Sequence, residues 1–320
     1  MENWNTSTDV LILEALNVTP QSSLPVFILL LLFYIFIMVS DIGMVVLILC
    51  NSSLHQPMYL LLCNMTVNDA FGATIILPHL LKDLLLSSSE RYIHYWACAT
   101  QAFCIHLKAS VSHTVLVIMA VDRYMAICNP LRYAAVMTHQ MVASLSWAAW
   151  GSACVLVAIL VGLSVRLSRC RQIVFNLVCD NASLFSLSCE SVIINNVYGL
   201  VYTVLLLGTS MVSIALTYLK IIAVCLSSRN KALNSKALQT CSTHLAVYMM
   251  LLVSSFIIVI MHRFPQLSQH RKVASVLGHV ALPALNIVIY GLQIKEIRSK
   301  VVCSSSSKIL MIQTFILQNM

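Results

Sequence analysis

The sequence predicts an all-α membrane protein, a single bundle of seven transmembrane helices. Of its 320 residues, 59% are hydrophobic and only 9% are charged, whereas a soluble domain carries about a quarter charged residues. The hydrophobic residues gather in seven long runs, each near or above the roughly 20 residues that a helix needs to cross the hydrocarbon core. Backbone groups in lipid must be hydrogen-bonded within their own segment, so each run is expected to be a helix.

The seven predicted spans cover residues 24–50, 58–86, 97–127, 141–162, 193–226, 237–261 and 273–293. An odd number of crossings puts the chain ends on opposite sides. Residues 1–23 are therefore expected to form an N-terminal segment on one side, 24–293 the helical domain, and 294–320 a tail on the other side. An outer-membrane barrel would instead need alternating segments of about ten residues, and the sequence lacks them.

The distribution of charge sets the orientation. Residues 1–81 contain no Lys or Arg, and Glu2, Asp9 and Glu14 make the N-terminus acidic. With no basic region before it and no cleavage site after it, the first span is expected to act as its own signal. Ten Lys and Arg residues fall on the side of the tail and seven on the other, a weak bias that places the N-terminus outside. The net charge of +8 is interpreted as a topology and surface effect.

The third span ends in the most informative segment, MAVDRYMAICNPLRY at residues 119–133. Its Asp122 and Arg123 follow a long apolar run, where charged groups are expensive and by default functional. Three further segments accompany it: LHQPMY at 54–59, KALQTCSTHL at 236–245 and PALNIVIY at 283–290. In this order and spacing, from about residue 24 to 298, the chain resembles the olfactory receptors, a branch of the rhodopsin-like G-protein-coupled receptors. The LHQPMY variant and residues 195–199 are similar to the fish-like branch.

The resemblance implies an odorant receptor, not an enzyme, in the plasma membrane of olfactory cilia. Such a receptor binds a small odorant in the outer half of the bundle and activates a stimulatory heterotrimeric G protein that raises cyclic AMP. A helix bundle does this when its two states differ in their affinity for the ligand and for the inner partner. No cofactor, metal or nucleic acid is expected.

The resemblance also implies a switch at the inner end of the bundle, formed by Asp122, Arg123, Tyr124, Tyr218 and Tyr290. Asp122 is expected to hold Arg123 in a charge-assisted pair at rest, and release of Arg123 would create a contact for the G protein. The alternative for Arg123 is a passive interfacial anchor, because arginine snorkels readily. The alternative for the tyrosines is membership of an aromatic belt.

A polar core is expected around the mid-span Asp69, with Ser112 and Asn286 as the partners that the resemblance offers. The alternative is a protonated acid with a purely structural role. The chain departs from the family pattern at Met44, where the family usually has Asn, and at Ile287, where it usually has Pro. Asp41 lies three residues before Met44, roughly on the same helix face, and is expected to substitute for the missing polar partner. The lost proline removes a kink, so a degenerate copy that does not signal remains an alternative.

The ligand pocket is expected between the outer halves of the third, fifth and sixth spans. Its candidate lining residues are Cys104, Ile105, Lys108, Ala109, Ser112, Val201, Tyr202, Leu205, Leu252, Ser255, Val259, His262 and Arg263. A mid-span ammonium should face a cavity or a carboxylate, and a related receptor has a carboxylate-holding arginine where Arg263 lies. Lys108 and Arg263 together suggest an anionic odorant in an otherwise apolar pocket. The alternatives for Lys108 are neutralisation by burial and pairing with Asp83, and the alternative for Arg263 is a headgroup anchor.

Cysteines and glycosylation signals test the topology. Four cysteines in or beside outer segments suggest two disulfides with three possible pairings, of which the resemblance selects Cys98–Cys179 and Cys170–Cys189. Glycosylation sequons begin at Asn5, Asn17 and Asn181. His106 and His113 lie seven residues apart but lack a third ligand, so ordinary buried histidines are expected there rather than a metal site. Residues 294–301 have the pattern of a short amphipathic eighth helix on the membrane.

Other membrane-protein classes fit less well. A transporter would show internal repeats or paired broken helices, and none are found. An opsin needs a lysine within the seventh span, and residues 273–293 contain none. An intramembrane protease would show a His-Glu-x-x-His motif or a recognisable pair of mid-membrane aspartates, and the sequence has neither.

Overall fold

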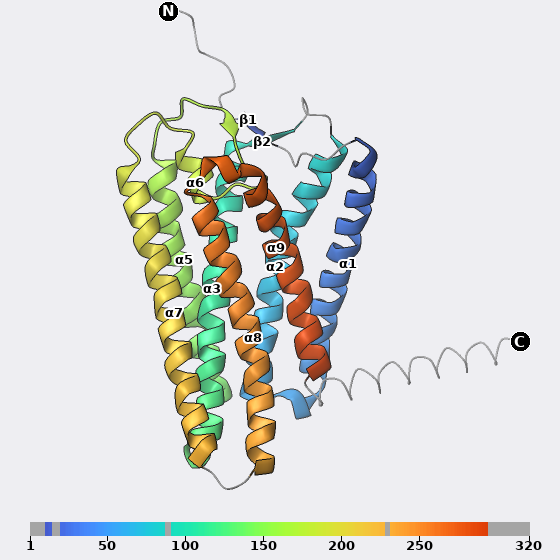
Figure 1. Cartoon of the computed structure of the whole chain (residues 1–320), viewed down its shortest axis with the longest axis vertical. Helices are drawn as coiled ribbons and strands as arrows, with labels where there is room; N and C mark the ends of the chain where they lie inside the picture. Colours follow the sequence, from blue (N-terminus) through green and yellow to red (C-terminus); the bar gives the residue numbers. More distant parts are fainter. Residues whose placement is uncertain (1–9, 15–19, 87–90, 228–230, 294–320) are drawn as a thin grey trace, which may run out of the picture.

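The computed structural model describes residues 10–14, 20–86, 91–227 and 231–293. Seven helices in this part of the chain are long and apolar enough to cross a membrane, and they stand side by side as one bundle (Figure 1). They are α1 (Pro20–Cys50), α2 (Pro57–Leu85), α3 (Tyr95–Cys128), α5 (His139–Val165), α7 (Ile193–Ser227), α8 (Lys231–Met261) and α9 (Ser268–Gln293). The seven-helix fold predicted from the sequence is confirmed.

Local sequence signals set several helix ends. Pro57 stands at the first position of α2, directly after Gln56 in extended backbone, where its missing N–H is not needed. The hydroxyl of Thr138 caps α5 by accepting a hydrogen bond from the backbone N–H of Met141, which satisfies one free donor of the first turn. Between α3 and α5 lies the short helix α4 (Pro130–Val136). Pro283 lies inside α9, which nevertheless continues to Gln293.

A small sheet covers one end of the bundle. Its strands are β1 (Val10–Leu13), β2 (Tyr92–His94) and β3 (Ile173–Val174), in the order β2-β1-β3. β1 pairs antiparallel with β2, with Leu11 opposite Ile93, and parallel with β3, with Ile12 opposite Ile173. This end also carries α6 (Asn181–Phe185) and is called the outer end below, while α9 finishes at the opposite, inner end (Figure 1).

Both predicted disulfides are present at the outer end. Cys98 at the start of α3 is bonded to Cys179 in the loop that follows α5, and Cys170 is bonded to Cys189 within that loop. The pairing selected by the resemblance is therefore confirmed. The loop from residue 166 to 192 is called the outer loop below.

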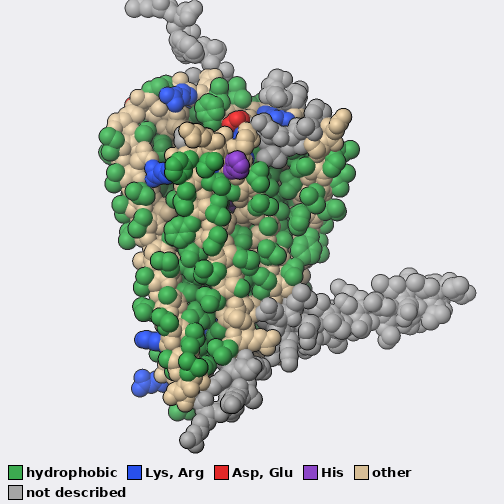
Figure 2. Space-filling view, in the orientation of Figure 1, with side chains coloured by type: hydrophobic (Ala, Val, Ile, Leu, Met, Phe, Trp, Pro, Cys, Tyr) green, Lys and Arg blue, Asp and Glu red, His purple; other side chains and the backbone are tan. Residues whose placement is uncertain are grey.

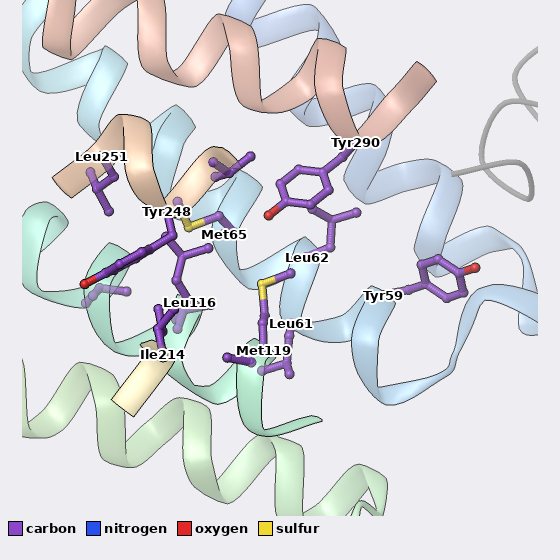
Figure 3. Close-up of a cluster of buried hydrophobic side chains, with 14 of the residues drawn as sticks. Tyr59, Leu61, Leu62, Met65, Leu116, Met119, Ile214, Tyr248, Leu251 and Tyr290 are labelled. Carbon is purple, nitrogen blue, oxygen red and sulfur yellow. The ribbon is translucent and has the colours of Figure 1, made fainter. Parts of the chain in front are cut away.

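The bundle has an apolar interior and an apolar exterior. Figure 3 shows the interior cluster, where Leu61, Met65, Leu116, Ile214 and Tyr248 from four helices meet. Hydrophobic side chains also cover much of the outer surface along the helices (Figure 2), including exposed leucines and isoleucines of α1 and α7. Soluble proteins rarely expose apolar area on this scale, so this surface is the one that faces lipid.

Candidate functional site: an outer cavity connected to an inner ion pair

A cavity of about 690 Å³ opens below the outer loop, between α3, α7, α8 and α9. Its lower walls are mostly apolar and include Ile105, Leu206, Leu207 and Val259. Its upper wall is polar and is supplied largely by the outer loop. An apolar pocket with a few convergent polar groups is typical of a small-molecule site.

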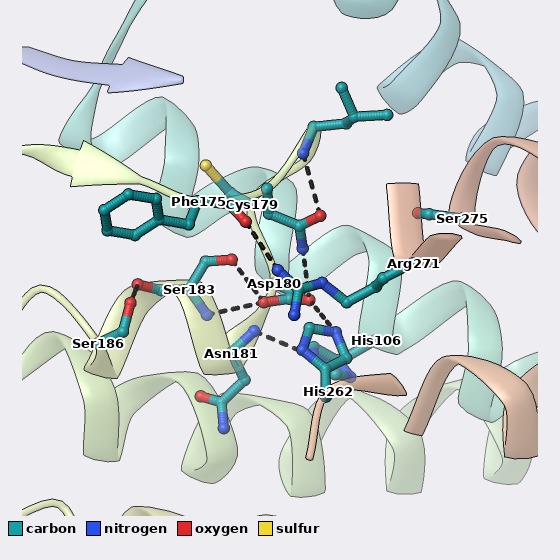
Figure 4. Close-up of polar contacts among 12 residues, drawn as sticks. His106, Phe175, Cys179, Asp180, Asn181, Ser183, Ser186, His262, Arg271 and Ser275 are labelled. Carbon is teal, nitrogen blue, oxygen red and sulfur yellow. Dashed lines mark hydrogen bonds and ion pairs between the residues drawn. The ribbon is translucent and has the colours of Figure 1, made fainter. Parts of the chain in front are cut away.

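Asp180 of the outer loop organises the upper wall (Figure 4). Its carboxylate accepts hydrogen bonds from the backbone N–H and the hydroxyl of Ser183, both at 2.7 Å. Asn176 donates to the second oxygen at 3.1 Å, and the Nε2 of His262 lies 2.8 Å from the same oxygen. Asp180 therefore connects the loop to the outer end of α8.

The electrostatics of this pair favour its ionised form. Burial tends to raise the pKa of Asp180, but the charge of His262 and hydrogen bonds from His262 and Ser183 outweigh it and hold that pKa below its usual range. In turn, the Asp180 carboxylate raises the pKa of His262 above its ordinary 6.5, against burial and the neighbouring arginines Arg271 and Arg263. The two shifts indicate an ion pair at neutral pH.

Three more contacts fix the outer loop over the cavity. The backbone N–H of Asn181 donates to Nε2 of His106 on α3 at 3.2 Å. The backbone N–H of Cys179 donates to the side chain of Gln101 at 2.8 Å. Arg271 on α9 donates from Nη2 to the carbonyl of Phe175 at 2.8 Å. The loop is thus held by α3, α8 and α9 as well as by its disulfides.

The floor of the cavity is connected to the packed interior. His113 on α3 lies 3.4 Å from the hydroxyl of Ser255 on α8 and 3.4 Å from that of Ser210 on α7. Ser210 is in turn 3.1 Å from the hydroxyl of Tyr248, whose ring meets His113 edge to face. A ligand on this floor would therefore touch a group of hydrogen-bonded side chains that joins three helices, α3, α7 and α8.

The structure brings some, but not all, of the predicted pocket residues to this cavity. Those that line it are Ile105, Ala109, Tyr202, Ser255, Val259, His262 and Arg263. Those that do not are Cys104, Lys108, Ser112, Val201, Leu205 and Leu252. Leu205 is 59% exposed, on the lipid-facing side of α7, and Leu252 is packed in the interior cluster.

Several lining residues were not predicted for the pocket. His279, Asp180 and Arg271 belong to α9 and the outer loop, which the expected pocket did not include. His113 lines the floor, although its sequence position suggested an ordinary buried histidine. The available signal was a surplus of histidines and arginines near the outer helix ends, but the sequence does not show which of them converge.

Of the two partners expected for Asp69, only Asn286 is bonded to it, and Lys108 is an unexpected third member of this polar core. Asn286 donates to Asp69 at 2.9 Å, and the ammonium of Lys108 lies 3.2 Å from the other carboxylate oxygen. Ser112 accepts a hydrogen bond from Asn68 at 2.9 Å. Lys108 thus pairs with Asp69 rather than with Asp83, which lies 3.2 Å from His79.

Asp41 does not take the role expected of it. Both of its carboxylate oxygens are buried and lack a hydrogen-bond partner among the described residues. Asp41 therefore makes no hydrogen bond to Asp69 in this conformation and does not supply the contact expected of the missing asparagine. Met44, which stands in the family's Asn position, is packed in the interior cluster.

At the inner end, Arg123 is paired with Asp122. Its Nη2 lies 2.5 Å and its Nε 3.1 Å from the same carboxylate oxygen. The other oxygen accepts a hydrogen bond of 2.9 Å from Tyr133 on α4, a residue that the sequence did not single out. Tyr124 lies below the ammonium of Lys220, which is 5.7 Å from its ring centre.

The two switch tyrosines are both buried. The hydroxyl of Tyr218 on α7 lies 2.5 Å from Nδ1 of His244 on α8. The hydroxyl of Tyr290 on α9 has no hydrogen-bond partner in the described part of the chain. Neither hydroxyl is bonded to Arg123, so the contacts expected of an active receptor are not made in this conformation.

Some predicted features lie elsewhere. Asn5, Asn17 and the eighth helix after residue 293 are outside the described residues. Asn181 is buried, and its side chain accepts a hydrogen bond of 2.7 Å from Ser164. Because a glycan needs an exposed amide, glycosylation of Asn181 does not fit this conformation.

Comparison with known proteins identifies the family. A family model described as "Olfactory receptor" matches residues 30–308. The human Olfactory receptor 51E2 is 33% identical over 272 residues, 84% of each chain. The human Olfactory receptor 52N5 is 32% identical over 274 residues, again 84% of each chain. The mouse Olfactory receptor 8G17 is 31% identical over 301 residues, 93% of this chain and 97% of that receptor. The chain belongs to the olfactory receptor family, the seven-helix, G-protein-coupled odorant receptors of the plasma membrane.

Proposed function

We propose that this odorant receptor binds an anionic odorant in the outer cavity and activates a stimulatory G protein. The observation that carries the proposal is the charge balance of the cavity wall. The lining acids Asp180 and Glu14 are already paired, with His262 at 2.8 Å and Lys272 at 3.0 Å. Arg263 and Arg271 also line the cavity and form no ion pair within the described residues. The surplus is positive, and the lower walls are apolar.

A route for the signal starts at the floor of the cavity. A ligand that displaces Ser255 or His113 acts on α8 and α3, because these side chains are bonded across the helices. A movement of α8 would strain the bond between Tyr218 and His244 nearer the inner end. In this mechanism Tyr218 and Tyr290 then become free to pack on Arg123 as it leaves Asp122. The ligand shifts the equilibrium between the resting and the active conformation only by the difference between its affinities for the two.

The test expresses the receptor with an accessory trafficking factor in cells that lack their own stimulatory α subunit. Surface staining and cyclic AMP are measured with and without the restored subunit, against carboxylates, their methyl esters, amino acids, steroids and amines. We expect responses that require the subunit and that are stronger for acids than for their esters. Equal responses to acids and esters would contradict the anionic ligand.

The same experiment separates the competing functions. A receptor that reaches the surface but answers no ligand would favour the degenerate copy suggested by Met44, Ile287 and the unpartnered Asp41. Uptake of a probe without a G-protein response would favour a transporter.

A further inference from the structure

The guanidinium of Arg271 is the least compensated buried charge at the cavity. Arg271 lies in the first turn of α9, is only 9% exposed and lines the cavity. Its single hydrogen bond in the described structure runs from Nη2 to the carbonyl of Phe175. Its Nε is buried and has no hydrogen-bond partner among the residues that the structure describes. No described carboxylate lies within ion-pair distance of it.

Such an arrangement is unfavourable unless an anion is supplied. Moving a charge out of water is strongly penalised when no counter-charge accompanies it. Asp180, one of the two acids that line the cavity, is already bound by Ser183, Asn176 and His262 (Figure 4). Glu14, the other lining acid, is 3.0 Å from the ammonium of Lys272. The described residues therefore supply no counter-charge to Arg271, and an anion bound in the cavity would supply one.

Arg263 does not need a counter-charge to the same extent. It also lines the cavity, but it is exposed at the outer end of α8. An exposed guanidinium is hydrated and screened by salt, so pairing it gains little. Burial thus selects Arg271 as the stronger anchor of the two.

We propose that Arg271 is the carboxylate anchor of this receptor and that its ligand is a medium-chain monocarboxylate. This assignment rests on the proposed function in that it specifies the ligand of the same cavity. The carboxylate pairs with the guanidinium below the outer loop, in a charge-assisted contact that suits the planar donors of arginine. The chain lies between Ile105, Leu206 and Val259 on the apolar lower walls. A cavity of about 690 Å³ would stay mostly empty around acetate or propionate, so longer acids bind better.

The test measures binding separately from signalling. Purified receptor in detergent is heated with decanoate, methyl decanoate, 1-decanol or acetate, and the shift of the unfolding temperature is recorded over a concentration series. The same four probes are applied to cells for cyclic AMP. The variants are Arg271→Gln, which removes the charge, Arg271→Lys, which keeps it, and Arg263→Gln, which tests the exposed arginine as the competing anchor.

In the unaltered receptor we expect decanoate to stabilise at concentrations at least tenfold lower than methyl decanoate, which is the worth of one charge-assisted contact, and acetate to have little effect. Arg271→Gln should remove this preference but keep the weak response to the ester, while Arg271→Lys and Arg263→Gln largely keep it. Because the acid-to-ester ratio is taken within each variant, a lower expression level does not alter it.

Two results would overturn the assignment. One is an undiminished acid-to-ester ratio in Arg271→Gln, and the other is loss of that ratio in Arg263→Gln alone. If Arg271→Gln fails to fold, the decision falls on Arg271→Lys and Arg263→Gln, and loss of acid preference only in the latter rejects Arg271. Decanoate binding without cyclic AMP would contradict the proposed signalling function and leave the anchor supported.

Discussion

The ammonium of Lys108 lies 3.2 Å from a carboxylate oxygen of Asp69, in the middle of the bundle where both side chains are buried. Asn286 donates to the second oxygen. The counter-charge of Asp69 is thus a side chain of the receptor itself, the ammonium of Lys108. The pair joins α2 to α3, and Asn286 extends it to α9.

Removing only the cation should destabilise the receptor. Lys108→Met leaves Asp69 buried without its counter-charge, and breaking a buried ion pair from one side costs about 3–5 kcal/mol. We expect a large fall in surface level and in unfolding temperature. Lys108→Met combined with Asp69→Asn should recover much of the loss, because an amide needs no counter-charge. An equal loss in the single and double variants would contradict the pairing.

Gly72 makes room for this pair. A Cβ atom at Gly72 would come within 2.9 Å of Cγ of Lys108, closer than real contacts allow. Gly72→Ala should therefore lower the unfolding temperature, with a penalty in the range of about 1–3 kcal/mol for overpacking. The matched control is Gly151→Ala in α5, where nothing lies within 4 Å and alanine improves helix propensity. If both variants behave alike, the close contact is not what holds Lys108 in place.

Arg123 is expected to be required for signalling but not for folding. Arg123→Ala removes the group that would leave Asp122 and contact the G protein, so agonist-stimulated cyclic AMP should vanish while surface staining stays near its normal level. Tyr133→Phe is the companion change, since it removes only the 2.9 Å hydrogen bond to Asp122. It should raise basal cyclic AMP and keep the agonist response. Retained signalling in Arg123→Ala would reject the switch.

The Asp180–His262 pair predicts a pH dependence of known sign. The pKa of His262 is raised, so its contribution to stability is present at low pH and lost as pH rises through the raised value. The pKa of Asp180 is lowered, so its contribution is lost only in strong acid. Raising the pH from 6 to 9 should lower the unfolding temperature of the unaltered receptor more than that of His262→Gln. Parallel curves for the two proteins would show that the pair does not stabilise the loop.

The fold was predictable because its signals are local and repeated. Each signal concerns a single helix: the seven apolar runs predict the spans, the charged pair marks the end of α3, and a proline marks the start of α2. The disulfides needed the resemblance, since four cysteines alone allow three pairings.

The cavity was predicted only in part because it depends on contacts between elements. Lys108 and Ala109 are neighbours, yet successive residues of a helix point about 100° apart. Helical spacing therefore could not decide which of them faces the cavity, and only Ala109 does so. Asp180 reaches the cavity through the path of the outer loop, which no periodic pattern encodes, and Arg271 reaches it from α9.

The sheet at the outer end has a consequence for the order of assembly. β1 precedes α1 in the chain, whereas its parallel partner β3 follows α5, so Ile12 is synthesised long before Ile173. Closing so long a stretch of chain is entropically unfavourable until the intervening helices are packed. We therefore expect this strand to dock late, after the first helices have inserted. A nascent receptor halted before α5 would leave Leu11 and Leu13 without the members of their apolar cluster that come from α5 and the outer loop.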